Sequence, residues 1–134
     1  MRTMLATATG RPCGVGSLPL VEGRPAPLPY TVLYPLGGPV GGAPFADAAE
    51  DAHPTYQVTV VAARSDQAEW LADRVRRAFL ARTPAGGWES ELTAPGISVW
   101  GRQLIVDEAG DSSTSDVVTY IQRYRLDASK PQTG

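Results

Sequence analysis

The sequence is poor in the residues on which most catalytic and metal sites depend. Its 134 residues include one cysteine, Cys13, and one histidine, His53. A single cysteine excludes an internal disulfide and any cysteine-rich metal site. Catalysis by a Ser-His-Asp or Cys-His arrangement would have to use His53, and Cys13 reads more simply as a small buried apolar residue. We therefore predict that the protein is not an enzyme and has no metal site and no cofactor.

The sequence also lacks an excess of either charge and any long apolar run. Twelve basic residues stand against fourteen acidic ones, which gives a formal net charge of -2. Binding of a monomer to nucleic acid would need a basic excess to displace counterions from the phosphates. The longest apolar runs have only a few residues, whereas roughly 20 are needed to cross a bilayer. We expect a single soluble domain with no membrane partner.

Glycine and proline, by contrast, are abundant, with 14 and 12 residues. Many of them lie in residues 35–55, where we expect a long loop, and such loops are functional or disordered. The glycines do not form phosphate-binding motifs. Gly14-x-Gly16 lacks the third glycine of the dinucleotide fingerprint, and residues 37–42 are not followed by Lys-Ser or Lys-Thr.

One helix is well defined by the sequence, over about residues 67–81. Its apolar residues recur at helical spacing and form one stripe, made of Ala68, Leu71, Val75, Ala78 and Phe79. Asp66 and Glu69 have the spacing of a capping box at its start. The opposite side carries Trp70, Arg74, Arg76 and Arg77, so that Trp70 and Arg74 are placed for a cation–π contact. This face is either solvated or meets a partner, and Trp88 and Trp100 are more typical of packing.

The remaining elements are strands. Apolar and β-branched residues predict strands over 30–34, 56–63, 97–106 and 117–126, and a weaker one over 13–18. A short N-terminal helix precedes them, with Leu5 and Ala8 facing the core. The order predicts an α+β fold, in which the main helix packs on a mostly antiparallel sheet of about four or five strands. Residues 1–127 form one domain, and residues 128–134 form a disordered tail.

Several stretches taken in order carry a family resemblance. They are Thr9-Gly10-Arg11-Pro12, the strand from Pro29 to Pro35, the strand Tyr56 to Val61, the helix from Asp66 to Arg76, and Gln122-Arg123-Tyr124-Arg125-Leu126. Over residues 5–127 the chain resembles the small tail-terminator (minor tail, tail-completion) proteins of long-tailed phages, especially those that infect actinobacteria. The resemblance rests on order and spacing rather than on one diagnostic motif.

This resemblance implies a virion structural protein without catalytic residues. Its subunits would assemble in the host cytoplasm into a closed ring, usually a hexamer, that sits on the major tail tube protein at the head–tail junction. The ring would stop tube growth, join the neck or head-completion protein, and let DNA pass through its lumen without specific binding. Alternatives are a neck or head-completion connector subunit and, from a different class, a small-ligand-binding or enzymatic α+β domain.

Within such a ring we assign two sets of residues by inference. The interface set is Trp70, Arg74, Arg77 and, as the apolar anchor of the long loop, Phe45. The acidic set is Asp47, Glu50 and Asp51, which would line the lumen or meet a neighbour, and repeated carboxylates would repel DNA phosphates. Asp107, Glu108 and Asp111 either add to this lining or form an ordinary solvated loop.

Overall fold

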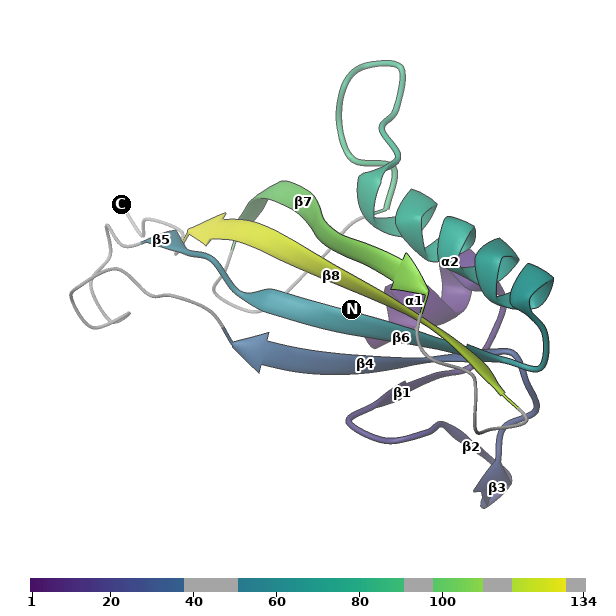
Figure 1. Cartoon of the computed structure of the whole chain (residues 1–134). Coiled ribbons are helices and arrows are strands. Elements are labelled where there is room, and N and C mark those ends of the chain that lie inside the picture. The colour runs from purple at the N-terminus through teal and green to yellow at the C-terminus, as the bar shows by residue number, and fades with distance from the viewer. Residues whose placement is uncertain (38–50, 91–97, 110–116, 130–134) are drawn as a thin grey trace.

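The structure is a computed structural model that describes residues 1–37, 51–90, 98–109 and 117–129. Two helices and eight strands follow one another along these described residues (Figure 1). Their bounds are α1 (Arg2–Thr9), β1 (Cys13–Val15), β2 (Leu20–Val21), β3 (Arg24–Pro25), β4 (Tyr30–Gly37), β5 (Asp51–Ala52), β6 (Thr55–Ala62), α2 (Ser65–Leu80), β7 (Ser98–Ala109) and β8 (Val118–Ser129).

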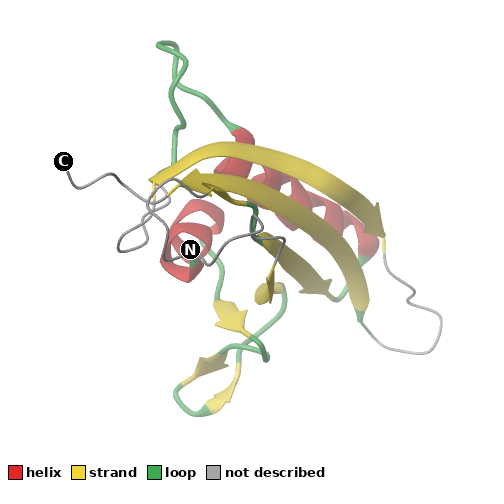
Figure 2. Ribbon diagram, turned by 90° about the vertical axis from the view of Figure 1, so that its left-hand side faces the viewer, coloured by secondary structure: helices red, strands yellow, loops and turns green. Residues whose placement is uncertain are grey.

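The main sheet has six strands, of which β5 has only two residues. Its order is β1-β4-β6-β8, with β7 on the far side of β8 and β5 at the end of β8. β1 runs parallel to β4, and the other pairs are antiparallel. Both helices lie on one face of this sheet (Figure 2). The predicted α+β fold, with a mostly antiparallel sheet and one main helix, is confirmed.

The core lies between the sheet and α2. All five residues of the predicted apolar stripe are at most 3% exposed, and so is Ala72. They meet the inner faces of β6 and β8, where Val58, Val60 and Tyr124 are fully buried. The rings of Phe79 and Tyr124 stack with centroids 3.9 Å apart, which fixes α2 against β8.

The short helix α1 covers the remaining edge of this core. Leu5 is fully buried. Thr9 is also buried, and its hydroxyl is satisfied there because it donates to the Leu5 carbonyl at 2.7 Å. The helix ends at Gly10, whose φ of 70° is the left-handed conformation that glycine adopts without strain. The predicted N-terminal helix is therefore present, and it packs against α2.

The predicted capping box at the start of α2 is wrong. The helix begins at Ser65 with Arg64 as N-cap, so Asp66 already lies inside the first turn. There its carboxylate accepts from the Gln67 N–H and pairs with Arg64 at 3.3 Å. Gln67, not Glu69, is the third helical residue, and its side-chain oxygen accepts from the N–H of Ala63, which precedes the N-cap, at 3.3 Å.

The long loop is shorter than expected at both ends. β4 continues to Gly37, and Asp51 lies in β5, opposite Ser129 of β8, rather than in a loop. Phe45, Asp47 and Glu50 lie outside the described residues. β8 itself continues to Ser129, two residues into the segment predicted to be a disordered tail.

Candidate functional site

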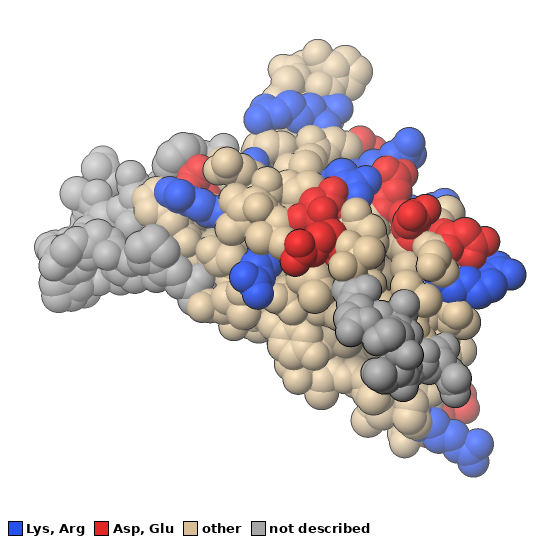
Figure 3. Space-filling model, viewed as in Figure 1, with Lys and Arg blue, Asp and Glu red and all other residues tan. Residues whose placement is uncertain are grey.

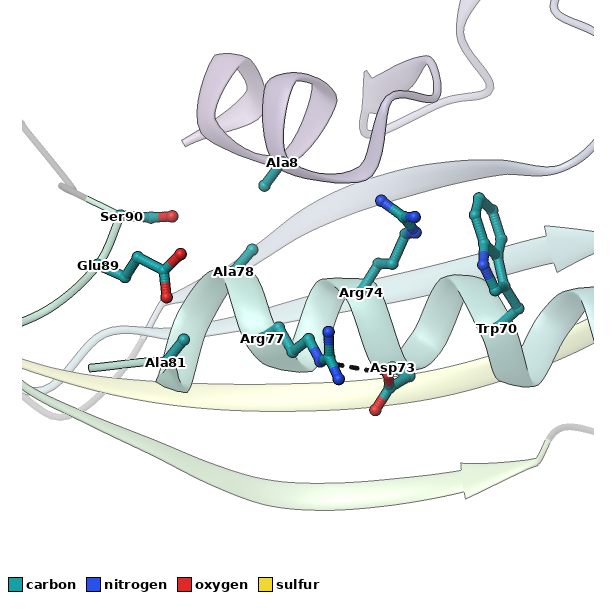
Figure 4. Close-up of a pocket in the computed structure, with 9 residues that line it drawn as sticks. All are labelled: Ala8, Trp70, Asp73, Arg74, Arg77, Ala78, Ala81, Glu89 and Ser90. Atoms are coloured by element: carbon teal, nitrogen blue, oxygen red, sulfur yellow. Dashed lines mark ion pairs between the residues drawn. The ribbon is translucent and has the colours of Figure 1, made fainter. Parts of the chain in front are cut away.

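A groove lies between α1 and α2 and is closed at one end by the segment 81–90 (Figure 4). Its volume is about 600 Å³. Three alanines form its apolar part: Ala8 from α1, Ala78 from α2 and Ala81, which follows α2 directly. Polar and aromatic side chains surround them, namely Trp70, Asp73, Arg74, Arg77, Glu89 and Ser90. The groove thus contains three of the four residues that the sequence assigned to an interface.

Trp70 and Arg74 form the exposed end of this groove. Trp70 is 45% exposed, and the Arg74 guanidinium lies 4.6 Å from the centre of its ring. The predicted cation–π pair is therefore present. Arg77 lies one turn further on, and its Nε is 3.5 Å from the Asp73 carboxylate. An exposed tryptophan beside an arginine is a combination enriched at the energetic centres of protein interfaces.

The segment 81–90 forms the opposite end of the groove and projects from the body of the molecule (Figures 1 and 2). It folds back on itself, since Arg82 pairs with Trp88 in a β-bridge and the Glu89 N–H donates to the Ala81 carbonyl at 2.9 Å. The guanidiniums of Arg82 and Arg102 lie 3.9 and 4.7 Å from the Trp88 ring centre. Trp88 is half-buried and packs against two arginines of its own chain.

Arg102 ties this segment to the sheet and to α2. Its two terminal nitrogens donate to the Phe79 carbonyl at 3.1 Å and the Ser90 carbonyl at 2.6 Å. Burial, and then repulsion from Arg82, lowers the pKa of the Arg102 guanidinium. These contacts hold the wall formed by Glu89 and Ser90 in a fixed place beside α2.

Arg76 does not belong to the exposed basic face. It lies between α2 and β7, where it pairs with Asp73 and with Asp107, each at 3.2 Å. Asp107 accordingly lies in a strand and holds an arginine, so its assignment to an acidic loop was wrong. Although burial acts to raise it, hydrogen bonds from Arg76 and Gln122 hold the pKa of Asp107 below its ordinary value. Asp111 lies outside the described residues.

Gln122 is a polar group in the core that the sequence patterns did not indicate. Its side chain is fully buried in β8, and its amide nitrogen donates to the Ala72 carbonyl at 3.0 Å and to Asp107 at 3.2 Å. Its oxygen accepts from the Tyr124 hydroxyl at 3.1 Å. Burial raises the pKa of Tyr124, so this hydroxyl stays protonated and remains a donor. A glutamine at an inward position of a strand was the available signal.

Cys13 and His53, the single cysteine and histidine, take part in packing and in a hydrogen bond to β8, respectively. Cys13 is 8% exposed, and burial raises the pKa of its thiol. His53 Nδ1 lies 2.8 Å from Asp127 Oδ1, which joins the start of β6 to β8. No group of three or more His, Cys, Asp or Glu side chains within the described ranges could hold a metal ion. Within the same residues, neither helix has the length and apolarity of a membrane span.

Comparison with known proteins identifies a similar structure. No protein-family model matches the chain, and no curated protein matches it. The chain is similar to a chain in the virion of a native gene transfer agent particle, with 19% identity and a TM-score of 0.59. The match covers 93% of this chain and 84% of that chain. Nearly the whole chain therefore shares the fold of a chain in this virion particle.

Proposed function

We propose that this protein is a structural component of a phage-like virion, and that it forms the ring that terminates the tail. The ring caps the tail tube, stops its growth and presents the surface that joins the head. The observation that carries this proposal is the fold shared with a virion component along 93% of the chain. The resemblance of residues 5–127 to tail-terminator proteins, which rests on the order of several sequence segments, supports the same role.

The groove between α1 and α2 favours a role in assembly with other protein subunits. An open hollow with an exposed Trp–Arg pair suits a protein surface better than a small ligand, which needs an enclosed apolar pocket. The single cysteine and the single histidine have structural surroundings, since the Cys13 thiol is buried and His53 is bonded to Asp127. We expect the His53→Ala variant to assemble on tails like the wild type. Loss of function in a folded His53→Ala protein would contradict a purely structural role.

Electron microscopy of the purified protein mixed with tail tubes tests the proposal. We expect a closed ring, six-fold in the simplest case, at one end of each tube and no further growth from that end. A ring that binds isolated heads but leaves tube ends free would identify a neck or head-completion subunit instead. A protein that stays monomeric both alone and beside tubes would contradict the proposal.

A further inference from the structure

We propose that the groove between α1 and α2 receives the β2–β3 hairpin of a neighbouring copy of this chain. The subunits would then join head to tail, with each copy giving its hairpin to one neighbour and its groove to the other. This inference rests on the proposed ring, because it names the contact by which the ring closes. We call Leu18 and residues 20–25 the hairpin.

The hairpin exposes apolar side chains that a neighbour would cover. Leu20 is 63% exposed, Val21 45% and Leu18 42%. Leu20 and Val21 pair only with Pro25 and Arg24 in the described part of the chain. Three large apolar residues together on a projecting element are typical of a protein contact surface.

The tip of the hairpin carries a strained charged residue. The two-residue turn is Glu22-Gly23, with φ of 54° and 78°. Positive φ at both positions is the geometry of a type I′ turn, in which Asn, Asp or Gly normally takes the first place. A glutamate there costs conformational energy, and strain of this kind accumulates where a side chain is needed for function. The strained backbone keeps the Glu22 carboxylate at the tip.

The base of the hairpin is held firmly by the rest of the molecule. The Ala26 N–H donates to the Pro19 carbonyl at 2.9 Å, and Ala26 is buried. The Arg11 side chain donates to the Pro29 carbonyl at 2.8 Å and the Pro27 carbonyl at 3.0 Å. A preorganised hairpin loses little conformational entropy on docking, which favours binding.

The charges of the hairpin and of the groove are complementary. The hairpin carries Glu22 and Arg24, and neither forms an ion pair among the described residues. The groove has Arg74 beside Trp70 at one end and Glu89 at the other (Figure 4), and both charges are also without an ionic partner in the described structure. Glu22 would meet Arg74 and Arg24 would meet Glu89. Val21, which lies opposite Arg24 and so shares its face of the hairpin, would lie over the alanines between them.

The positions of the two surfaces fit a ring rather than a closed pair. The hairpin projects from the end of the molecule opposite the segment 81–90, which forms one end of the groove (Figures 1 and 2). Charged side chains gather over α2 and β7 and again at the hairpin, with largely uncharged surface over β4 between them (Figure 3). A contact between two different surfaces is heterologous, and such contacts generate rings when the rotation closes.

Charge reversal in the full-length protein tests the contact, with oligomeric state measured by light scattering and native mass spectrometry. We expect Glu22→Arg and Arg74→Glu each to weaken subunit association by at least about tenfold. The double variant Glu22→Arg/Arg74→Glu restores the attraction at every contact and should recover most of that loss. Arg64→Glu, which makes the same exchange at an exposed arginine outside the groove, is the matched control and should assemble normally.

Cross-linking provides a second test, which traps the contact covalently and does not rely on the strength of the charge pair. A chain with Glu22→Cys and Arg74→Cys should form disulfide-linked ladders that end at the ring size, because Cys13 is buried. A mixture of the two single variants should give dimers and nothing longer. Rings without ladders and without rescue would overturn this contact and leave the proposed function standing. A chain that is monomeric alone and beside tubes would overturn both.

Discussion

Gln122 and Asp107 show how single polar residues fix the position of α2. Gln122 bonds to the helix backbone, to Asp107 and to Tyr124, and Asp107 in turn holds Arg76 of the helix. A buried polar side chain is tolerated only when its partners are present, and removal of one leaves the others unsatisfied. These contacts specify the orientation of the helix on the sheet, whereas apolar burial alone would tolerate several.

Replacement of Gln122 by leucine should therefore destabilise the protein despite the greater apolarity. We expect a loss of about 1–3 kcal/mol in the free energy of unfolding, because the Tyr124 hydroxyl loses its acceptor inside the core. Urea unfolding followed by circular dichroism measures it. Gln103→Leu, at an exposed position of β7, is the control. A Gln122→Leu protein as stable as the wild type would show that the network contributes nothing.

The lowered pKa of Asp107 makes part of the stability dependent on pH. A carboxyl whose pKa is lower in the folded than in the unfolded state, here below its usual 3.8, stabilises the fold at pH values above that figure. This contribution disappears as the pH falls through the folded pKa. We expect Asp107→Asn to be less stable than the wild type at pH 6 and nearly equal at pH 2. A difference that stays constant between these pH values would contradict the assignment.

Cys13→Ser exchanges the buried thiol for a hydroxyl with a stronger need for a hydrogen bond. We expect a cost of about 1 kcal/mol or more, measured by thermal or urea unfolding, while ring assembly is retained. Cys13→Ala removes the same thiol without adding a hydroxyl and serves as the control. Loss of assembly in folded Cys13→Ser and Cys13→Ala proteins alike would indicate that the thiol itself acts.

At the scale of elements, we predict that the long segment between β4 and β6 is needed for function but not for folding. Replacement of residues 38–50 by a Gly-Ser link should leave the circular dichroism spectrum unchanged, because the length of the chain that connects two strands affects stability little. If Phe45, Asp47 and Glu50 form the proposed contact or lumen lining, tails should lack a terminator or fail to join heads. Normal termination and joining by the shortened protein would show that the segment is dispensable.

Sequence periodicity predicted the elements well where one face is buried. The stripe of α2 and the alternation of β6 have a single apolar side, and both are buried as expected. The β2–β3 hairpin was missed because its apolar residues are exposed, so that no inward face marks it. The groove could be half predicted: Trp70 and Arg74 were found from their spacing, whereas Glu89 and Ser90 come from a distant segment whose position depends on Arg102.

At the scale of the whole molecule, one core serves both helices and the main sheet. Residues from α1, β1, β4, β6, α2 and β8 belong to a single buried cluster. A shared core couples the elements, so that none can leave without exposing the others. We expect one unfolding transition, with coincident midpoints by far-UV circular dichroism and by tryptophan fluorescence. Separate midpoints would show that α1 or the segment 81–90 unfolds independently.

The irregular pairing of β7 has a consequence for how subunits can associate. Its register with β8 shifts at two places, between Val99 and Gly101 and between Leu104 and Val106. Bulges twist a strand and interrupt the straight row of backbone donors and acceptors that another strand would need. An outer strand interrupted in this way resists uncontrolled edge-to-edge pairing with the strands of other molecules. In the proposed ring, subunits would then join through complementary side chains, which close after a fixed number of copies, rather than through strand pairing, which has no such limit.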